Sequence, residues 1–75
     1  NGSTTYALKL IALTAHHLKI IAANPEAFRQ TEIDGVRESA MGHFSIYYKI
    51  LANQIVVMAF WDNRQDSKSL LKAIQ

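Results

Sequence analysis

Cysteine is absent from this 75-residue chain, so the chain can form neither a disulfide nor a thiolate metal site. Long hydrophobic runs are absent too. The longest apolar stretches, 10–13 and 55–61, are far shorter than the roughly 20 residues that cross a bilayer. Neither a signal peptide nor a membrane span is expected. We therefore expect a protein of the reducing cytoplasm that has no membrane partner.

Strong charge of either sign is also lacking. The net charge is +2, from eight basic and six acidic residues, and this does not indicate the dense cationic surface of a nucleic-acid-binding protein. Any basic face belongs to the second half of the sequence, whose cations are Arg37, Lys49, Arg64, Lys68 and Lys72.

The three histidines do not form a metal-binding pattern. His16 and His17 are adjacent in a predicted helix, so their side chains point about 100° apart and cannot hold one ion together. His43 falls in a predicted turn. We expect no metal site and no cofactor.

The length allows one domain, 1–75, and a marginal one. Ordering this many residues costs on the order of 100 kcal/mol, at roughly 1.5 kcal/mol each. The apolar residues, which make up 49% of the chain, must therefore nearly all be buried. A partner that adds buried surface would stabilise such a domain.

The first third of the chain predicts one long helix, about 3–23. The segment has no glycine or proline, Ser3 is a suitable N-cap residue, and Asn24-Pro25 ends the helix because proline cannot donate the next hydrogen bond. Apolar side chains cover roughly two-thirds of the circumference, whereas a helix on one sheet needs a stripe of about a third. We therefore expect other elements to pack against this helix on two sides. The apolar residues are Tyr6, Leu8, Leu10, Ile11, Leu13, Ala15, Leu18, Ile20, Ile21 and Ala22.

Three strands and a short helix are predicted after a connector at 28–35. The strands are expected at about 36–41, 44–50 and 55–61, and the helix at about 67–74. A hairpin-length connection over 51–54, with Asn53 as turn former, makes the sheet an antiparallel meander. The expected fold class is α+β: one long helix packed on a three-stranded antiparallel sheet, plus a short C-terminal helix.

The patterning of the last two strands predicts how they are placed. The strand at 44–50 alternates, with a core face of Phe44, Ile46, Tyr48 and Ile50 and an opposite face of Ser45, Tyr47 and Lys49. The strand at 55–61 is apolar on both faces, which is typical of a central strand.

Three stretches also carry a family pattern: Gly35-Val36-Arg37, then Met41 to Ile50 (MGHFSIYYKI), then Ile55 to Asp66 (IVVMAFWDNRQD). With the helix that ends at Asn24-Pro25, their order resembles the C-terminal half of the RelE/ParE toxin superfamily. That family has a strand carrying an arginine, a strand of aromatic-Ile-Tyr type, a hydrophobic strand and an Arg-Asp or Arg-x-Asp exit. Its pattern starts with one more strand and helix, so the resemblance implies a truncated RelE/ParE-like fold.

The resemblance implies the toxin component of a bacterial type II toxin–antitoxin (plasmid stabilisation) system, neutralised by a cognate antitoxin. RelE-like members cut mRNA on the ribosome with basic residues, and ParE-like members inhibit DNA gyrase. The RelE-type pattern places basic residues where this chain has Val36, Glu38 and Ser45, and a tyrosine where it has Leu70. Arg64 alone matches, so we expect a ParE-like toxin that acts by protein binding rather than by catalysis.

Two alternatives stay open. One is a RelE-like ribosome-dependent mRNA endonuclease centred on Arg64 and Arg37, which would act on the ribosome and mRNA. The other is a non-toxic truncated remnant that serves as an interaction or oligomerisation module. In either case we expect a second copy of the chain, or an N-terminal segment, to pack on the apolar part of the helix surface that the sheet leaves uncovered.

Five residues are candidates for binding. Arg64, in a polar loop after the last strand, could bind a phosphate or a protein, or could pair with Asp62 or Asp66. Arg37 could line a binding face or pair with a carboxylate. The other three candidates are Tyr47, Lys49 and Trp61. Tyr47 and Lys49 could form an aromatic and basic binding surface, but the favoured interpretation of their face is a solvated strand face. Trp61 is interpreted as a core or rim aromatic rather than as a platform for base stacking.

Overall fold

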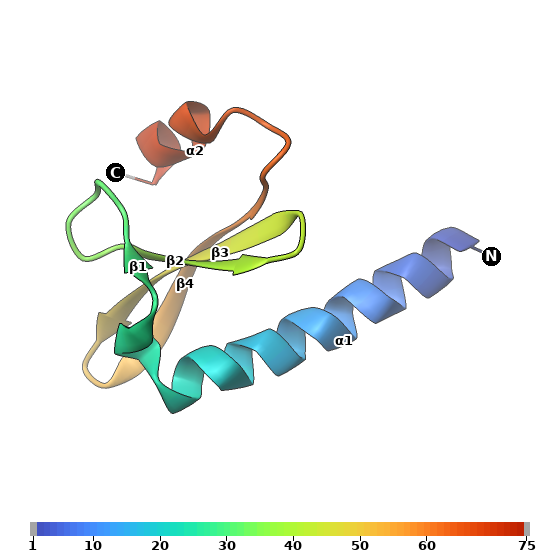
Figure 1. The fold of residues 1–75 in the computed structure, drawn as a ribbon, viewed down its shortest axis with the longest axis horizontal. Coiled ribbons are helices and arrows are strands. Elements are labelled where there is room, and N and C mark those ends of the chain that lie inside the picture. The colour runs from blue at the N-terminus through green and yellow to red at the C-terminus, as the bar shows by residue number, and fades with distance from the viewer. Residues whose placement is uncertain (1, 75) are drawn as a thin grey trace.

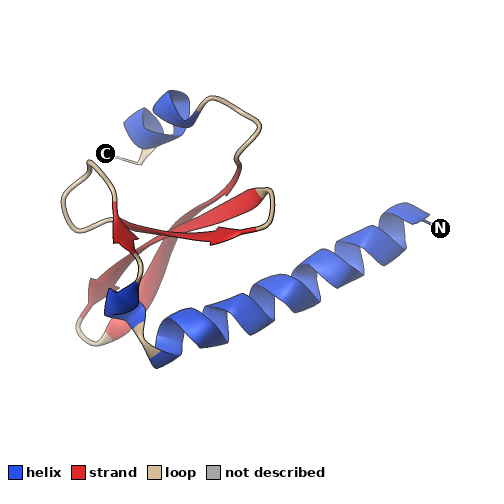
Figure 2. Ribbon diagram, in the orientation of Figure 1, coloured by secondary structure: helices blue, strands red, loops and turns tan. Residues whose placement is uncertain are grey.

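The computed structural model describes residues 2–74 of the chain (Figures 1 and 2). The predicted α+β class is confirmed, because a long helix lies on one side of an antiparallel sheet and a short helix on the other (Figure 1). The elements are α1 (Gly2–Ala23), the 3-10 helix η1 (Pro25–Ala27), β1 (Arg29–Gln30), β2 (Arg37–Met41), β3 (Phe44–Leu51), β4 (Gln54–Asp62) and α2 (Ser67–Ala73).

Helix α1 has 22 residues and is about 33 Å long at 1.5 Å per residue. It ends where predicted: Asn24 has an extended φ of −153°, and Pro25 follows as the first residue of η1. Figure 1 shows the C-terminal half of α1 beside the sheet and the N-terminal half projecting beyond it. The sheet therefore covers little of the surface of the projecting half.

The sheet contains a strand that the sequence did not predict. Its order is β1-β2-β3-β4 with antiparallel neighbours, and β1 lies inside the segment predicted as a connector. Arg29 pairs with Glu38 in this ladder, and Thr31 N continues it with a hydrogen bond of 2.9 Å to Val36 O. Two polar residues show no hydrophobic alternation, so this strand is set by its partner and not by its own pattern.

Strand β4 was predicted to be central and lies at an edge of the sheet. It pairs with β3 over its whole length, from Gln54 opposite Leu51 to Asp62 opposite Phe44, and the described residues supply no strand on its other side. On the α2 face, Met58, Ala59 and Trp61 of β4 pack against the buried cluster that includes Leu70, whereas Val57 and Phe60 on the α1 face are partly exposed. A β-bulge beside Tyr47 and Tyr48 shifts the register in the middle of the pair.

Two clusters of buried side chains lie on opposite faces of the sheet. On the α1 face, Ile21 packs with Ile46 and Tyr48. On the α2 face, Val36 and Tyr47 pack with Leu70. The core face predicted for β3 is therefore confirmed, whereas the opposite face, predicted to be solvated, holds a second small core under α2.

The hairpin between β3 and β4 is a two-residue turn at Ala52-Asn53. Both residues have positive φ, 52° and 62°, as the commonest two-residue hairpin turn requires. Asn53 is the predicted turn former. The turn between β2 and β3 places Gly42 at φ 61°, which glycine adopts without steric cost.

Much of the apolar surface of α1 and β4 lies open. The exposed fraction is 65% for Ile11 and 63% for Leu8 on α1, and 48% for Val57 on β4. The prediction that one flank of α1 lacks cover inside this chain is confirmed for the described residues. Among the helices of the described part, none is sufficiently long and apolar to span a membrane.

Candidate functional site

An apolar groove runs between α1 and β4 on the α1 face of the sheet. Its volume is about 440 Å³. One wall is α1, and the floor and second wall come from β3 and β4. The lining residues are Leu10, Ile11, Thr14, Ala15, Leu18, Ile46, Val57 and Phe60. Thr14 Oγ1 donates to Leu10 O at 2.7 Å, so the one hydroxyl in the lining is already satisfied within the helix.

The β-bulge between β3 and β4 explains how Val57 and Phe60, three residues apart, come to share this wall. Phe60 is opposite Ile46 in the ladder, and Val57 is opposite Tyr48, so both side chains lie on the α1 face. Phe60 also stacks on Phe44, with ring centroids 4.9 Å apart and planes 20° apart. This stacking holds Phe60 at the rim of the groove.

The free edge of β4 borders the groove. An edge strand presents unpaired backbone N–H and C=O groups, and proteins usually protect such an edge with lysine, proline or an inward-pointing charge. From Gln54 to Trp61 this strand carries none of these. A hydrophobic groove beside an unprotected edge is a surface on which another segment can pack and pair.

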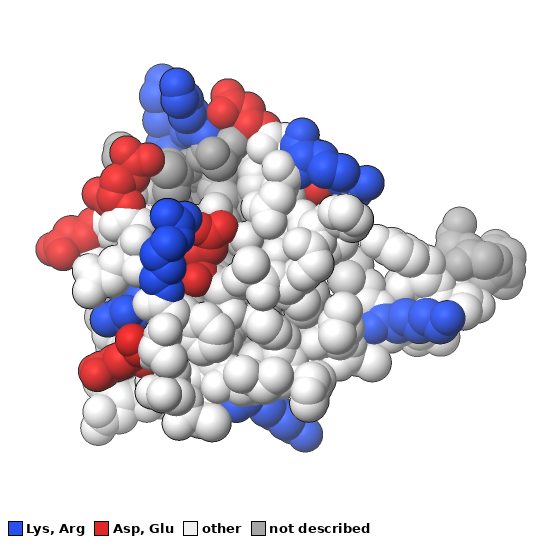
Figure 3. Space-filling model, viewed as in Figure 1, with Lys and Arg blue, Asp and Glu red and all other residues white. Residues whose placement is uncertain are grey.

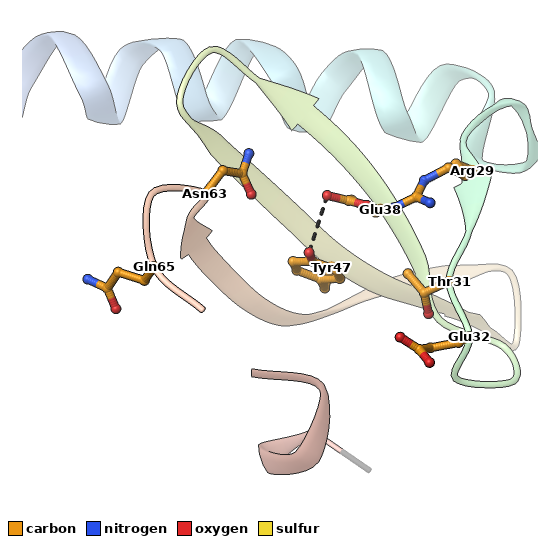
Figure 4. A pocket seen from close by; sticks show the side chains of 7 residues that line it. All are labelled: Arg29, Thr31, Glu32, Glu38, Tyr47, Asn63 and Gln65. Atoms are coloured by element: carbon orange, nitrogen blue, oxygen red, sulfur yellow. Dashed lines mark hydrogen bonds and ion pairs between the residues drawn. The ribbon is translucent and has the colours of Figure 1, made fainter. Parts of the chain in front are cut away.

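A polar cleft lies on the other side of the sheet, toward α2 (Figure 4). Its volume is about 340 Å³. Glu38, on β2, is central: its carboxylate accepts hydrogen bonds from Ser45 Oγ at 2.8 Å and Tyr47 OH at 3.2 Å, and it pairs with the Arg29 guanidinium. Asn63 Nδ2 donates to Ser45 Oγ at 2.9 Å. The lining residues are Arg29, Thr31, Glu32, Glu38, Tyr47, Asn63 and Gln65.

The pKa values in this cleft show how its groups are held. Burial opposes ionisation of Glu38, but the hydrogen bonds from Arg29, Ser45 and Tyr47 outweigh it, so the pKa of Glu38 is lowered. Burial, together with the neighbouring Glu38 carboxylate, raises the pKa of Tyr47. The Glu38 carboxylate is thus ionised, fully hydrogen-bonded and a weak base. Tyr47 stays neutral and donates its hydroxyl hydrogen to that carboxylate.

Sequence reasoning missed this cleft. It compared Glu38 and Ser45 with family positions for basic residues and assigned no role to Arg29 or Asn63. The signal was present in the alternation, because Glu38 and Tyr47 fall on the same face once β2 and β3 are paired.

Arg37 lies on the α1 face, away from the cleft. Its Nη1 donates to Phe28 O at 2.7 Å and to Glu26 O at 3.2 Å, so its guanidinium binds the segment that links α1 to β1. Neither predicted role is observed among residues 2–74: the guanidinium of Arg37 binds backbone carbonyls, and no described carboxylate pairs with it. It satisfies backbone carbonyls that β-pairing leaves free.

Arg64 forms the ion pair with Asp62 that the sequence offered as an alternative. Arg64 Nη2 lies 2.6 Å from Asp62 Oδ2, and Arg64 Nε lies 2.9 Å from Asp62 Oδ1. These side-chain hydrogen bonds lower the pKa of Asp62 to about 2. The pair is exposed at the exit of β4. Arg64 and Arg37 are therefore not brought together, and both cations already have partners.

The other three candidates lie on the α2 face. Tyr47 is buried against Val36 and Leu70, and Trp61 packs against the same cluster, as predicted for a core or rim aromatic. The Nε1 atom of Trp61 is buried without a hydrogen-bond partner in the described part of the chain. Lys49 shares this face by alternation. The predicted aromatic and basic surface does not form, because Tyr47 belongs to the second core.

The histidines are dispersed. His17 Nε2 lies 2.6 Å from Ser39 Oγ, on the side of α1 that faces β2, and His16 is exposed. Within residues 2–74, no three His, Asp or Glu side chains lie close enough to hold a metal ion.

The comparisons with known proteins found no relative. No family model matches the chain, and no curated protein or solved structure matches it either. The RelE/ParE resemblance therefore stays a prediction based on the order of the segments.

Proposed function

We propose that this chain is the toxin component of a toxin–antitoxin pair, of ParE-like type, that acts by binding a protein target such as DNA gyrase. The observation that carries the proposal is the open apolar groove between α1 and β4. Ile11, Val57 and their neighbours form it without a polar group that could take part in catalysis. Exposed apolar surface of this kind marks protein interaction sites. A cognate antitoxin neutralises the toxin by occupying the same groove.

The arrangement of the cations supports binding over catalysis. An RNA-cleaving site needs a titratable base within hydrogen-bond reach of a cation that is free to stabilise phosphate charge. Arg37 is engaged by backbone carbonyls, Arg64 by Asp62, and Glu38 by three donors. None of these three side chains could act on a phosphate or a ribose hydroxyl without first breaking its contacts inside the chain.

Growth after induction of the full-length gene tests the proposal. We expect growth arrest that co-expression of the neighbouring gene product relieves, and inhibition of gyrase supercoiling by the purified protein. Wild-type protein that neither arrests growth nor inhibits gyrase, yet self-associates, would favour the oligomerisation module instead.

A ribosome-dependent endonuclease is the second candidate, and the polar cleft favours it. Glu38, Tyr47 and Arg29 bring a carboxylate, a phenol and a guanidinium to one cavity. A ligand that displaced Arg29 from Glu38 would free a base. Cleavage of mRNA on ribosomes that Glu38→Gln abolishes would support this function, and intact mRNA during growth arrest would exclude it.

A further inference from the structure

A small cavity lies on the flank of α1 away from the groove. Its volume is about 270 Å³. Helix α1 supplies one wall through residues that follow one another at intervals of three and four, which places them along one side of the helix. They are Tyr6, Lys9, Leu10 and Leu13, of which Leu10 also lines the groove. The groove and this cavity therefore lie on either side of Leu10.

The turn between β2 and β3 forms the opposite wall, so we call this space the turn cavity. Met41 ends β2, Phe44 begins β3, and Gly42 and His43 form the turn between them. In Figure 1 this turn points to the same side of the molecule as the projecting half of α1. Met41 is buried, whereas Leu13 on the facing helix is 51% exposed. The apolar walls thus border a space that the described part of the chain leaves unfilled.

Two basic side chains line the turn cavity, and each is free to bind a ligand. Lys9 lies on the helix wall and His43 on the turn. Among residues 2–74, neither side chain makes a hydrogen bond or an ion pair. The Asp62 carboxylate is near enough to His43 for their charges to interact, but the guanidinium of Arg64 binds both of its oxygens. No acidic residue of the described chain lines the cavity.

The charge around the helix wall is also basic. Helix α1 contains Lys9 and Lys19 and no acidic residue. In Figure 3, the described part of α1 that projects beyond the sheet shows basic and uncharged atoms and no acidic ones. Red atoms gather instead toward the β1 end of the molecule. Charge complementarity therefore favours an anion in the turn cavity.

The size and the lining of the turn cavity select the chemistry of its ligand. Pockets for small molecules usually measure about 300–1,000 Å³ and combine apolar walls with a few polar groups that fix orientation. At about 270 Å³ the turn cavity is at the small end of this range. Leu10, Leu13 and Met41 offer contacts to an aliphatic chain. Lys9 can donate a charge-assisted hydrogen bond to a carboxylate, and a ring N–H of His43 can donate a second one.

We propose that the turn cavity binds a small amphipathic carboxylate of medium chain length. The chain lies among Leu10, Leu13 and Met41, and the carboxylate meets Lys9 and His43. A bound chain fills the space between the projecting half of α1 and the turn, so it stabilises the folded state by mass action. The inference is independent of the proposed function, because the groove lies on the opposite flank of α1.

Titration of the ¹⁵N-labelled full chain with octanoate, followed through its backbone amide shifts, tests this proposal. We expect saturable shifts at 6–13 and 41–44 and none at 55–57. Octylammonium, which has the same chain and the opposite charge, should bind about fivefold more weakly. Butanoate has four methylenes fewer and should bind at least about tenfold more weakly, because each buried methylene contributes about fourfold.

Matched variants locate the binding site. Leu13→Glu places a carboxylate in the turn cavity and should abolish octanoate binding, whereas Ile11→Glu, on the groove flank, should leave it unchanged. Both side chains are more than half exposed, so neither change removes a buried contact. Lys9→Glu should reverse the preference, so that octylammonium binds more tightly than octanoate. Lys19→Glu makes the same change in net charge outside the cavity and should not reverse it.

The opposite outcomes overturn the proposal. Equal affinity for octanoate and octylammonium would remove the charged end of the site, and an unchanged preference in Lys9→Glu would exclude Lys9 as the partner of the anion. Shifts that centre on Val57 and vanish in Ile11→Glu would assign the aliphatic chain to the groove. Shifts that rise linearly without saturation would show non-specific adsorption. None of these results bears on growth arrest, so their failure is distinct from a failure of the proposed function.

Discussion

Ile11 on α1 and Val57 on β4 line the same groove, and yet 65% of the surface of Ile11 and 48% of that of Val57 are exposed. Two apolar side chains on facing elements normally bury each other. Here they border a space that neither fills, because α1 packs toward β2 and β3 and β4 lies at the edge of the sheet. The open space between them is what the proposed function uses.

The two flanks of α1 should respond differently to truncation. Ile21 is fully buried against Ile46 and Tyr48, so Ile21→Ala should lower the free energy of unfolding by about 2–5 kcal/mol. Ile11→Ala removes a similar number of methyl groups from an exposed position and should change it by less than about 0.5 kcal/mol. Urea denaturation of the isolated chain measures both. Equal losses would mean that Ile11 is buried in solution.

The two sequence-predicted arginines should differ in the same way. Arg37→Ala removes hydrogen bonds to Phe28 O and Glu26 O and should cost about 2 kcal/mol or more, as hydrogen bonds to charged groups do. Arg64→Ala breaks only an exposed pair with Asp62 and should leave the urea midpoint unchanged. A larger loss of stability for Arg64→Ala than for Arg37→Ala would show that Arg37 does not stabilise the fold through these hydrogen bonds.

The hydroxyl of Tyr48 joins the sheet to η1, which follows directly after α1. Tyr48 OH donates to Pro25 O at 2.6 Å, so Tyr48→Phe should destabilise the fold by about 1 kcal/mol. Thermal unfolding followed by far-UV circular dichroism checks this, with Tyr6→Phe, at an exposed position on α1, as the control. A stability change no larger than that of the control would contradict the contact.

Stability should depend on pH through Glu38. Its pKa lies below the usual value of 4.5, so the folded state binds this proton less readily than the unfolded state does. The stabilisation is therefore complete above about pH 4.5 and is lost as the pH falls through the lowered pKa. Urea midpoints between pH 7 and pH 3 should fall for the wild type and fall less for Glu38→Gln. Parallel curves would show that Glu38 is not held by its donors.

The sequence predicted the elements whose patterning is local. The helix up to Asn24-Pro25, the alternating β3 and the turn at Ala52-Asn53 follow from capping, periodicity and turn chemistry. It did not reveal β1, which depends on pairing with β2 and has no pattern of its own. The sequence also predicted β4 at the centre of the sheet, because apolar residues on both faces do not distinguish a buried strand from an apolar edge strand.

The site was predicted less well than the fold, and for a related reason. The wide apolar arc of α1 could be found from periodicity alone, and it became one wall of the groove. The charged and aromatic candidates were chosen singly, whereas their roles depend on which face they share: Tyr47 with Glu38, Arg37 with the carbonyls before β1. Such relations appear only once the strands are paired.

Growth after induction of three proteins in parallel tests the central claim most directly: wild type, Ile11→Glu and Glu38→Gln, each produced at equal soluble level. We predict that wild type and Glu38→Gln arrest growth and that Ile11→Glu does not, because the groove binds the target. Arrest by Ile11→Glu together with normal growth of cells that carry Glu38→Gln would contradict the account and assign the activity to the polar cleft.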